Sequence, residues 1–124
     1  MSDIVYITRK MTDKQPTHNW TFDKSKKIQE KTTRGIIEKI LKAHNIFYFA
    51  PVNFGYGRAG IPDVIACVNG KFLGIEAKGW KTGHTLTKDQ KLVIEDINRC
   101  GGATFVANPH NLNELIKLIE ELEK

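Results

Sequence analysis

The chain has few of the residues that characterise secreted, zinc-binding or membrane proteins. Its 124 residues include only two cysteines, Cys67 and Cys100, far apart in the sequence. Two distant cysteines make no disulfide framework, and no Cys and His spacing fits a zinc site. No apolar run is long enough to span a bilayer, and no signal peptide is present. These absences predict free thiols, a reducing cytoplasmic compartment and no membrane partner.

Charge is unevenly distributed along the chain, whose formal net charge is +5. Residues 1–42 hold ten Lys and Arg against five acids, whereas residues 109–124 hold two against four. A basic half suits a phosphate backbone, although a mildly basic protein can also be simply soluble. This length predicts one domain that buries roughly two-thirds of its unfolded surface.

The pattern of apolar residues predicts an N-terminal arm, residues 1–22, followed by a single domain, residues 23–124. Helices are expected over about 24–44, 88–100 and 112–122, with Asp23 or Ser25, Thr87 and Asn111 as N-caps. Strands are expected over 46–52, 64–68, 71–77 and 103–107, and residues 4–7 are a candidate for a further short strand. The order α-β-β-β-α-β-α predicts a small mixed β-sheet flanked by helices, an α/β domain, with a right-handed crossover from residue 71 to residue 107.

The most informative segment is a predicted hairpin between residues 60 and 78. Gly60-Ile61-Pro62-Asp63 precedes the first strand, Asn69-Gly70 lies at the turn, and Glu76-Ala77-Lys78 ends the second strand. Asn-Gly is the strongest short hairpin signal. Because the start of one antiparallel strand lies beside the end of the next, Asp63, Glu76 and Lys78 should meet. Glu76 and Lys78 are two positions apart, so they share one face.

This cluster of two acids and a lysine suits phosphodiester chemistry. Converging carboxylates bind hard cations such as Mg²⁺ or Mn²⁺, which polarise a phosphoryl oxygen and activate water. A neighbouring lysine stabilises charge in the transition state. The structural alternative is a hairpin that ends in an ordinary ion pair between Glu76 and Lys78.

Gly60-Ile61-Pro62-Asp63, Glu76-Ala77-Lys78 and Gln90 resemble the motifs of the PD-(D/E)xK nuclease superfamily, specifically its VRR-NUC domains. The resemblance covers roughly residues 28 to 108. It implies a restriction-endonuclease-like core in which Asp63, Glu76 and the Ala77 carbonyl bind the metal. Lys78 would be the catalytic lysine and Gln90 the family's helix glutamine. A capping box with Thr87 also explains Gln90 without any catalytic role.

The first helix offers two glutamates, and its apolar face distinguishes them. At about 100° per residue, the apolar residues between 36 and 41 form a stripe roughly 140° wide. Glu30 lies about 50° from the centre of this stripe and Glu38 about 130° from it. Glu38 is therefore expected to face solvent, and Glu30 to lean inward toward the metal. The resembling family also has a Glu early in this helix, although acids favour first turns through the helix dipole alone.

Loops on either side of the hairpin carry candidate DNA contacts. Arg58, Lys81 and Lys88 are expected to bind phosphates, which position a nucleic acid without specifying its sequence. Tyr56 and Trp80 are able to stack on bases. For Trp80 and Tyr56, covering an edge of the core is the favoured interpretation.

Together these features predict a Mg²⁺- or Mn²⁺-dependent DNA endonuclease with Asp63, Glu76, Lys78, Gln90 and Glu30 at its site. Two alternatives stay open: a nucleic-acid-binding module that does not cut, and a subunit that binds a partner through the apolar last helix. A short nuclease domain is compatible with a phage or mobile element.

Oligomeric state follows from the chemistry, because paired cuts in a duplex need two sites and C2 dimers are the commonest solution. Residues 4–7 are apolar and have no clear place in the core, so they are candidates for pairing across an interface. We therefore expect a homodimer in which residues 1–20 contribute to the contact. Two symmetric sites would favour branched DNA such as a Holliday junction. Leu115 and Ile119 of the last helix should instead cover the sheet.

Overall fold

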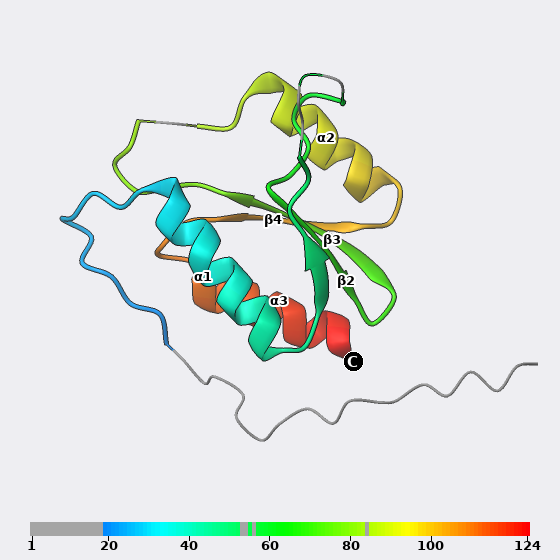
Figure 1. The fold of residues 1–124 in the computed structure, drawn as a ribbon, viewed down its shortest axis with the longest axis horizontal. Coiled ribbons are helices and arrows are strands. Elements are labelled where there is room, and N and C mark those ends of the chain that lie inside the picture. Colours follow the sequence, from blue (N-terminus) through cyan, green and yellow to red (C-terminus); the bar gives the residue numbers. More distant parts are fainter. Residues whose placement is uncertain (1–18, 53–54, 56, 84) are drawn as a thin grey trace, which may run out of the picture.

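The computed structural model describes residues 19–52, 55, 57–83 and 85–124 (Figure 1). The elements run in the order α1 (Glu30–Ala43), β1 (Phe47–Phe49), β2 (Val64–Val68), β3 (Lys71–Ala77), α2 (Lys88–Arg99), β4 (Ala103–Ala107) and α3 (Leu112–Glu123). The predicted class, an α/β domain with a small mixed sheet, is confirmed. The proposed strand at residues 4–7, and Tyr56, lie outside the described residues.

The sheet has four strands in the order β1-β2-β3-β4. β2 pairs antiparallel with β1 and with β3, whereas β4 pairs parallel with β3. The hairpin forms with the predicted bounds and with Val68 opposite Lys71. Asn69 and Gly70 have φ of 51° and 79°, the pair of positive values that a type I′ turn requires. Local turn chemistry therefore fixes the register of the central hairpin.

One face of the sheet carries the hydrophobic core, which α1 and α3 cover together (Figure 1). Alternate residues of β2 and β3 point into it because side chains alternate across a strand. Buried side chains of both helices meet them there: Ile36, Ile37, Ile40 and Leu41 from α1, and Leu112, Leu115 and Ile119 from α3. The expectation that Leu115 and Ile119 cover the sheet is confirmed, and the apolar stripe of the last helix is used inside the domain.

The opposite face of the sheet is covered by α2, which lies on the other side from α1 and α3 (Figure 1). Glycines allow a close approach. A Cβ at Gly74 would lie 3.4 Å from Ile97 Cδ1, and one at Gly102 would lie 2.7 Å from Ile97 Cγ2. Because α2 is held this close, its first turn reaches the end of β3, where the predicted site lies.

The start of α1 differs from the sequence prediction. The helix begins at Glu30, with Gln29 in the N-cap position and no side-chain cap. Asp23 instead accepts hydrogen bonds from the backbone N–H and the hydroxyl of Ser25. Ile28 is extended because its N–H donates to Trp80 O at 3.0 Å and its carbonyl accepts from Trp80 N at 2.8 Å. A long-range backbone pairing thus delays the helix by about one and a half turns.

Two other elements have different bounds or contacts from those predicted. β1 covers only Phe47–Phe49, not the expected residues 46–52. Asn111 is the N-cap of α3, but its side chain makes no cap hydrogen bond; it accepts from Asn108 N and donates to Val106 O. α2 begins as predicted, with Thr87 as N-cap and a complete capping box.

The segment before α1 belongs to the folded domain from residue 19 onward. Trp20 and Phe22 pack against the core. Trp20 N donates to Asn113 Oδ1 at 3.0 Å, which ties this segment to α3. Within the described part of the chain, no helix is long and apolar enough to cross a membrane.

Candidate active site

The hairpin brings Asp63 and the Glu76-Ala77-Lys78 segment together, as the sequence predicts. Asp63 lies just before β2, and its Oδ2 accepts a hydrogen bond from Ala77 N at 2.8 Å. This contact joins the first acidic motif to the second across the open end of the hairpin. Glu76, Lys78 and Gly74 share the face that α2 covers, since they alternate along β3.

Glu76 is the most perturbed acid at this site. It is only 3% exposed, although it carries a carboxyl group. Its pKa is raised from 4.5 to about 7. Burial is the largest cause of this increase, and the negative charge of Asp63 is the second. Lys78 and a backbone hydrogen bond from Asp63 lower this pKa, while the charge of Glu30 adds a smaller increase. The surroundings therefore oppose a second negative charge, which is the electrostatic condition that a bound cation relieves.

The ammonium group of Lys78 lies near three oxygens, one from Glu76 on β3 and two from the segment 85–90. Its Nζ lies 3.7 Å from Glu76 Oε2. The same ammonium donates to Gln90 Oε1 at 3.2 Å and to Thr85 O at 3.3 Å. Its position is thus set by the strand that carries it and by the segment leading into α2.

Gln90 links the helix cap to the acid and the lysine. Its Nε2 donates a short hydrogen bond to Glu76 Oε2, while its Oε1 accepts from Lys78. The same Oε1 accepts from Thr87 N at 2.9 Å, and Gln90 N donates to Thr87 Oγ1 at 3.1 Å. Capping and contact with Glu76 and Lys78 are therefore combined in one residue. The capping box is confirmed, and a catalytic role for Gln90 stays a prediction.

Glu30 and Glu38 occupy different environments, and one of them departs from expectation. Glu30 is the first residue of α1 and is half-buried, and its charge reaches Glu76. Glu38 was expected to face solvent, but it is half-buried and its Oε1 accepts a hydrogen bond from Tyr48 OH at 3.3 Å. The helical phase was right about which glutamate approaches the site. It could not reveal Tyr48, which comes from β1.

The described acidic groups of the site that lie closest together are the carboxylates of Asp63 and Glu76. In the described parts of the chain, no three His, Cys, Asp or Glu side chains group closely enough to hold a metal ion. Glu30 therefore acts on Glu76 through its charge but does not form a three-carboxylate set with Asp63 and Glu76. The carboxylates of Asp63 and Glu76 interact electrostatically at this end of the hairpin, and such oxygen donors could hold a hard cation that keeps several waters, as Mg²⁺ does.

The predicted phosphate contacts are dispersed. Lys88 is exposed at the first residue of α2, and Lys81 is exposed with φ of 59° in the loop after β3. Arg58 forms an ion pair with Asp96 on α2, and Arg99 also pairs with Asp96. Lys81 and Lys88 thus lie on the two segments that flank Lys78, whereas Arg58 is engaged with an acid on the α2 surface.

Trp80 is fixed by contacts with other parts of the fold. Its Nε1 donates to Lys24 O at 2.9 Å, and its ring makes an edge contact with His110, with centroids 4.2 Å apart. It also lines a hollow of about 420 Å³ with Lys78, Lys81 and Thr85. Trp80 therefore builds one wall of the site from a fixed position.

Arg34 is a neighbour of the site that the sequence analysis did not identify. It lies on α1 and lines a second hollow, of about 480 Å³, together with Asp63. The only sequence signal is its spacing of four residues from Glu30, which places both on one side of the helix. The hollow itself depends on residues 50–52 and 60–62, which no local pattern places beside α1.

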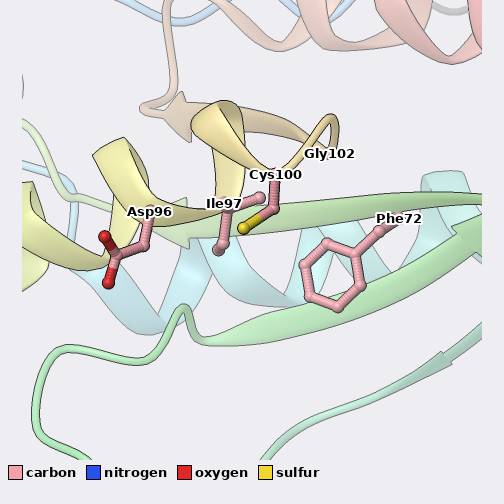
Figure 2. Close-up of a pocket in the computed structure, with 5 residues that line it drawn as sticks. All are labelled: Phe72, Asp96, Ile97, Cys100 and Gly102. Carbon is pink, nitrogen blue, oxygen red and sulfur yellow. The ribbon is translucent and has the colours of Figure 1, made fainter.

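A third pocket, of about 370 Å³, is unrelated to the acidic site (Figure 2). It lies between the far ends of β3 and α2 and is lined by Phe72, Asp96, Ile97, Cys100 and Gly102. Phe72 is four residues before Glu76, or ~13 Å along the strand. Among its described lining residues, Asp96 is the one acid, and it already binds Arg58 and Arg99. These lining residues therefore offer neither a second carboxylate nor a cation for phosphodiester chemistry.

Comparison with family models, with curated proteins and with solved structures finds no match to this chain.

Proposed function

We propose that this protein is a metal-dependent deoxyribonuclease that hydrolyses phosphodiester bonds at the Asp63, Glu76 and Lys78 cluster. The observation that carries the proposal is the buried Glu76 carboxylate, held between Asp63, Lys78 and Gln90 at the open end of the hairpin. Burying an acid beside another acid is costly unless a cation joins them. The alternative, a hairpin that ends in a surface ion pair, does not account for the burial of Glu76 or for its contact with Gln90.

Each residue of the cluster has a separate role. Asp63 and Glu76 hold Mg²⁺ or Mn²⁺, with the Ala77 carbonyl as the neighbouring oxygen donor; the bound cation supplies the Lewis acidity that phosphodiester hydrolysis needs. Lys78 is positioned to stabilise negative charge that develops on the phosphate. Gln90 keeps Lys78 and Glu76 in place. Glu30 contributes negative charge at the edge of the site.

The flanking segments support nucleic acid as the substrate. Lys81 is exposed in the loop after Lys78 and Lys88 is exposed at the start of α2, where both are able to contact phosphates. Arg58 joins them only if DNA competes with Asp96 for its guanidinium.

The decisive experiment compares cleavage of plasmid and branched DNA by the wild type, D63N, E76Q and E95Q with Mg²⁺, Mn²⁺, Ca²⁺ or a chelator. D63N and E76Q remove a ligand charge with little change of shape, so both should lose cleavage and still fold. E95Q is a matched control because Glu95 is exposed on α2. Cleavage at the wild-type rate by D63N or E76Q, or undiminished cleavage with chelator, would refute the assignment.

The same experiment addresses the alternative of a binding module. Such a module would bind DNA equally with chelator present and would cut nothing. The other alternative, a subunit that binds a partner through the last helix, has lost its basis because Leu112, Leu115 and Ile119 are fully buried.

A homodimer that acts on branched DNA is part of the proposal. β1 is an edge strand of the described sheet, and it exposes 70% of Phe47 and 49% of Phe49. Exposed apolar edge strands favour pairing with another chain. Light scattering should give twice the monomer mass, and a mass near 14.1 kDa at micromolar concentration would refute the dimer.

A further inference from the structure

The hollow beside Asp63 combines features that the proposed reaction does not use. Its volume is about 480 Å³, within the range of pockets that hold small molecules. Its described lining residues are one cation, the site acid and apolar or backbone surface: Arg34, Ala50, Pro51, Val52, Gly60, Ile61, Pro62 and Asp63. We call this hollow the Arg34 pocket. Because Asp63 belongs to its wall, any ligand in the pocket adjoins the reacting phosphate.

Arg34 is the basic residue of this pocket, and it makes no hydrogen bond or ion pair with the other described residues. It is half-buried, unlike the exposed Arg58 and Arg99, which both pair with Asp96. A half-buried guanidinium loses hydrogen bonds to water, and an anion that binds it replaces those hydrogen bonds. Its planar fork of N–H donors matches a phosphate group in geometry. The pocket therefore presents a phosphate-binding group at a fixed place beside Asp63.

The mouth of the pocket is apolar and open to solvent. Val52 is 73% exposed and Ile61 is 37% exposed. Proteins that deform DNA often insert apolar side chains between bases and partly unstack them, so exposed apolar groups near a phosphate-binding residue suit an unstacked base. Gly60 fixes this wall, since a Cβ there would lie 2.4 Å from the Asp89 carbonyl group of α2.

We propose that the Arg34 pocket binds an unpaired nucleotide next to the scissile phosphate. Arg34 holds the phosphate of that nucleotide, while Val52 and Ile61 pack against its base and sugar. This inference rests on the proposed function, because Asp63 defines where the reacting phosphate lies. What it adds is an assignment of residues: Arg34, Val52 and Ile61 recognise the nucleotide beside the cut.

The test measures binding, with Ca²⁺ in place of Mg²⁺, of a fluorescein-labelled paired duplex and of the same duplex with a single-stranded flap. R34A should weaken flap binding roughly ten-fold, as expected for the loss of a charged hydrogen bond. Its salt dependence should fall by about one unit of slope. R34K should keep the slope but lose part of the affinity. R99A is the matched control and should bind as the wild type does.

A double variant, V52S with I61S, tests the apolar contact without altering charge. It should reduce the preference for flap over paired duplex and leave the salt slope unchanged. Equal binding by R34A and R99A would overturn the phosphate contact. An unchanged flap preference in the double variant would overturn the unpaired-nucleotide site.

Parallel cleavage by the wild type with Mg²⁺ and Mn²⁺ separates this inference from the proposed function. If the wild type cuts but R34A binds DNA as R99A does, the pocket assignment alone is wrong. If the wild type cuts with neither metal, the nuclease assignment is wrong and the site beside Asp63 loses its reacting phosphate, whatever R34A binds.

Discussion

The raised pKa of Glu76 predicts how the stability of the metal-free protein depends on pH. The folded protein holds the Glu76 proton up to about pH 7, whereas an unperturbed carboxyl group loses it near 4.5. The stabilisation that this proton provides is complete below pH 4.5, falls between the two pKa values and is lost as pH rises through about 7. Since one pKa unit corresponds to about 1.4 kcal/mol, the full shift amounts to about 3 kcal/mol.

E76Q isolates this contribution because an amide stays neutral at every pH. The assay is urea unfolding of the wild type and E76Q in chelator between about pH 5 and about pH 8. The free energy of unfolding of E76Q relative to the wild type should rise by up to about 3 kcal/mol across that range. All other titrating groups cancel in the difference. If the free energies of unfolding of the two proteins changed with pH in parallel, the raised pKa of Glu76 in the folded protein would be refuted.

The metal arm of this assay uses the same two proteins. At about pH 8, Mg²⁺ or Mn²⁺ should stabilise the wild type, by about 2.7 kcal/mol when the metal is at 100 times its Kd. E76Q should gain much less, because it lacks one ligand charge. Equal stabilisation of both proteins would place the metal elsewhere.

Other variants test the remaining parts of the site. K78A should lose at least ~10²-fold in cleavage rate, whereas K81A should mainly weaken DNA binding and lower the salt slope by about one; equal rate losses would remove this distinction. E30Q should impair metal-dependent cleavage while E38Q leaves it intact, and the reverse result in a cleavage assay would show that the helix phase has no bearing on the site. G60A should destabilise the fold by about 1–3 kcal/mol, since φ is +87° and the added Cβ meets α2. Its control G35A, with open space around the new Cβ, should stabilise α1 by about 0.5–1 kcal/mol, as thermal unfolding would show.

The parts of the fold that follow local rules could be predicted from the sequence. Asn69-Gly70 set the hairpin, and that hairpin alone brings Asp63 to Glu76. Thr87 and Gln90 set the start of α2 through the capping box. In each case the local conformational preference of the residues is the same as the conformation they adopt in the fold. The turn and the helix start can therefore be predicted from the sequence.

The parts that depend on distant contacts could not be predicted in this way. The start of α1 is decided by the pairing of Ile28 with Trp80, far away in the sequence. The hydrogen bond of Glu38 to Tyr48 and the pocket around Arg34 likewise require knowledge of which strand lies beside the helix. A helix phase gives the direction of a side chain but not the identity of its neighbour.

The pairing of Ile28 with Trp80 has a consequence for where the domain can be divided. Gly79 crosses so close beneath it that a Cβ would lie 2.4 Å from Ile28 O. A chain that began at Glu30 would retain every proposed catalytic side chain, yet the Trp80 N–H and carbonyl and its indole N–H would lose their partners. Residues 19–28, which we call the strap, therefore hold the segment that follows Lys78 in place through hydrogen bonds to Trp80. Transplanting this site into another scaffold would require carrying the strap with it.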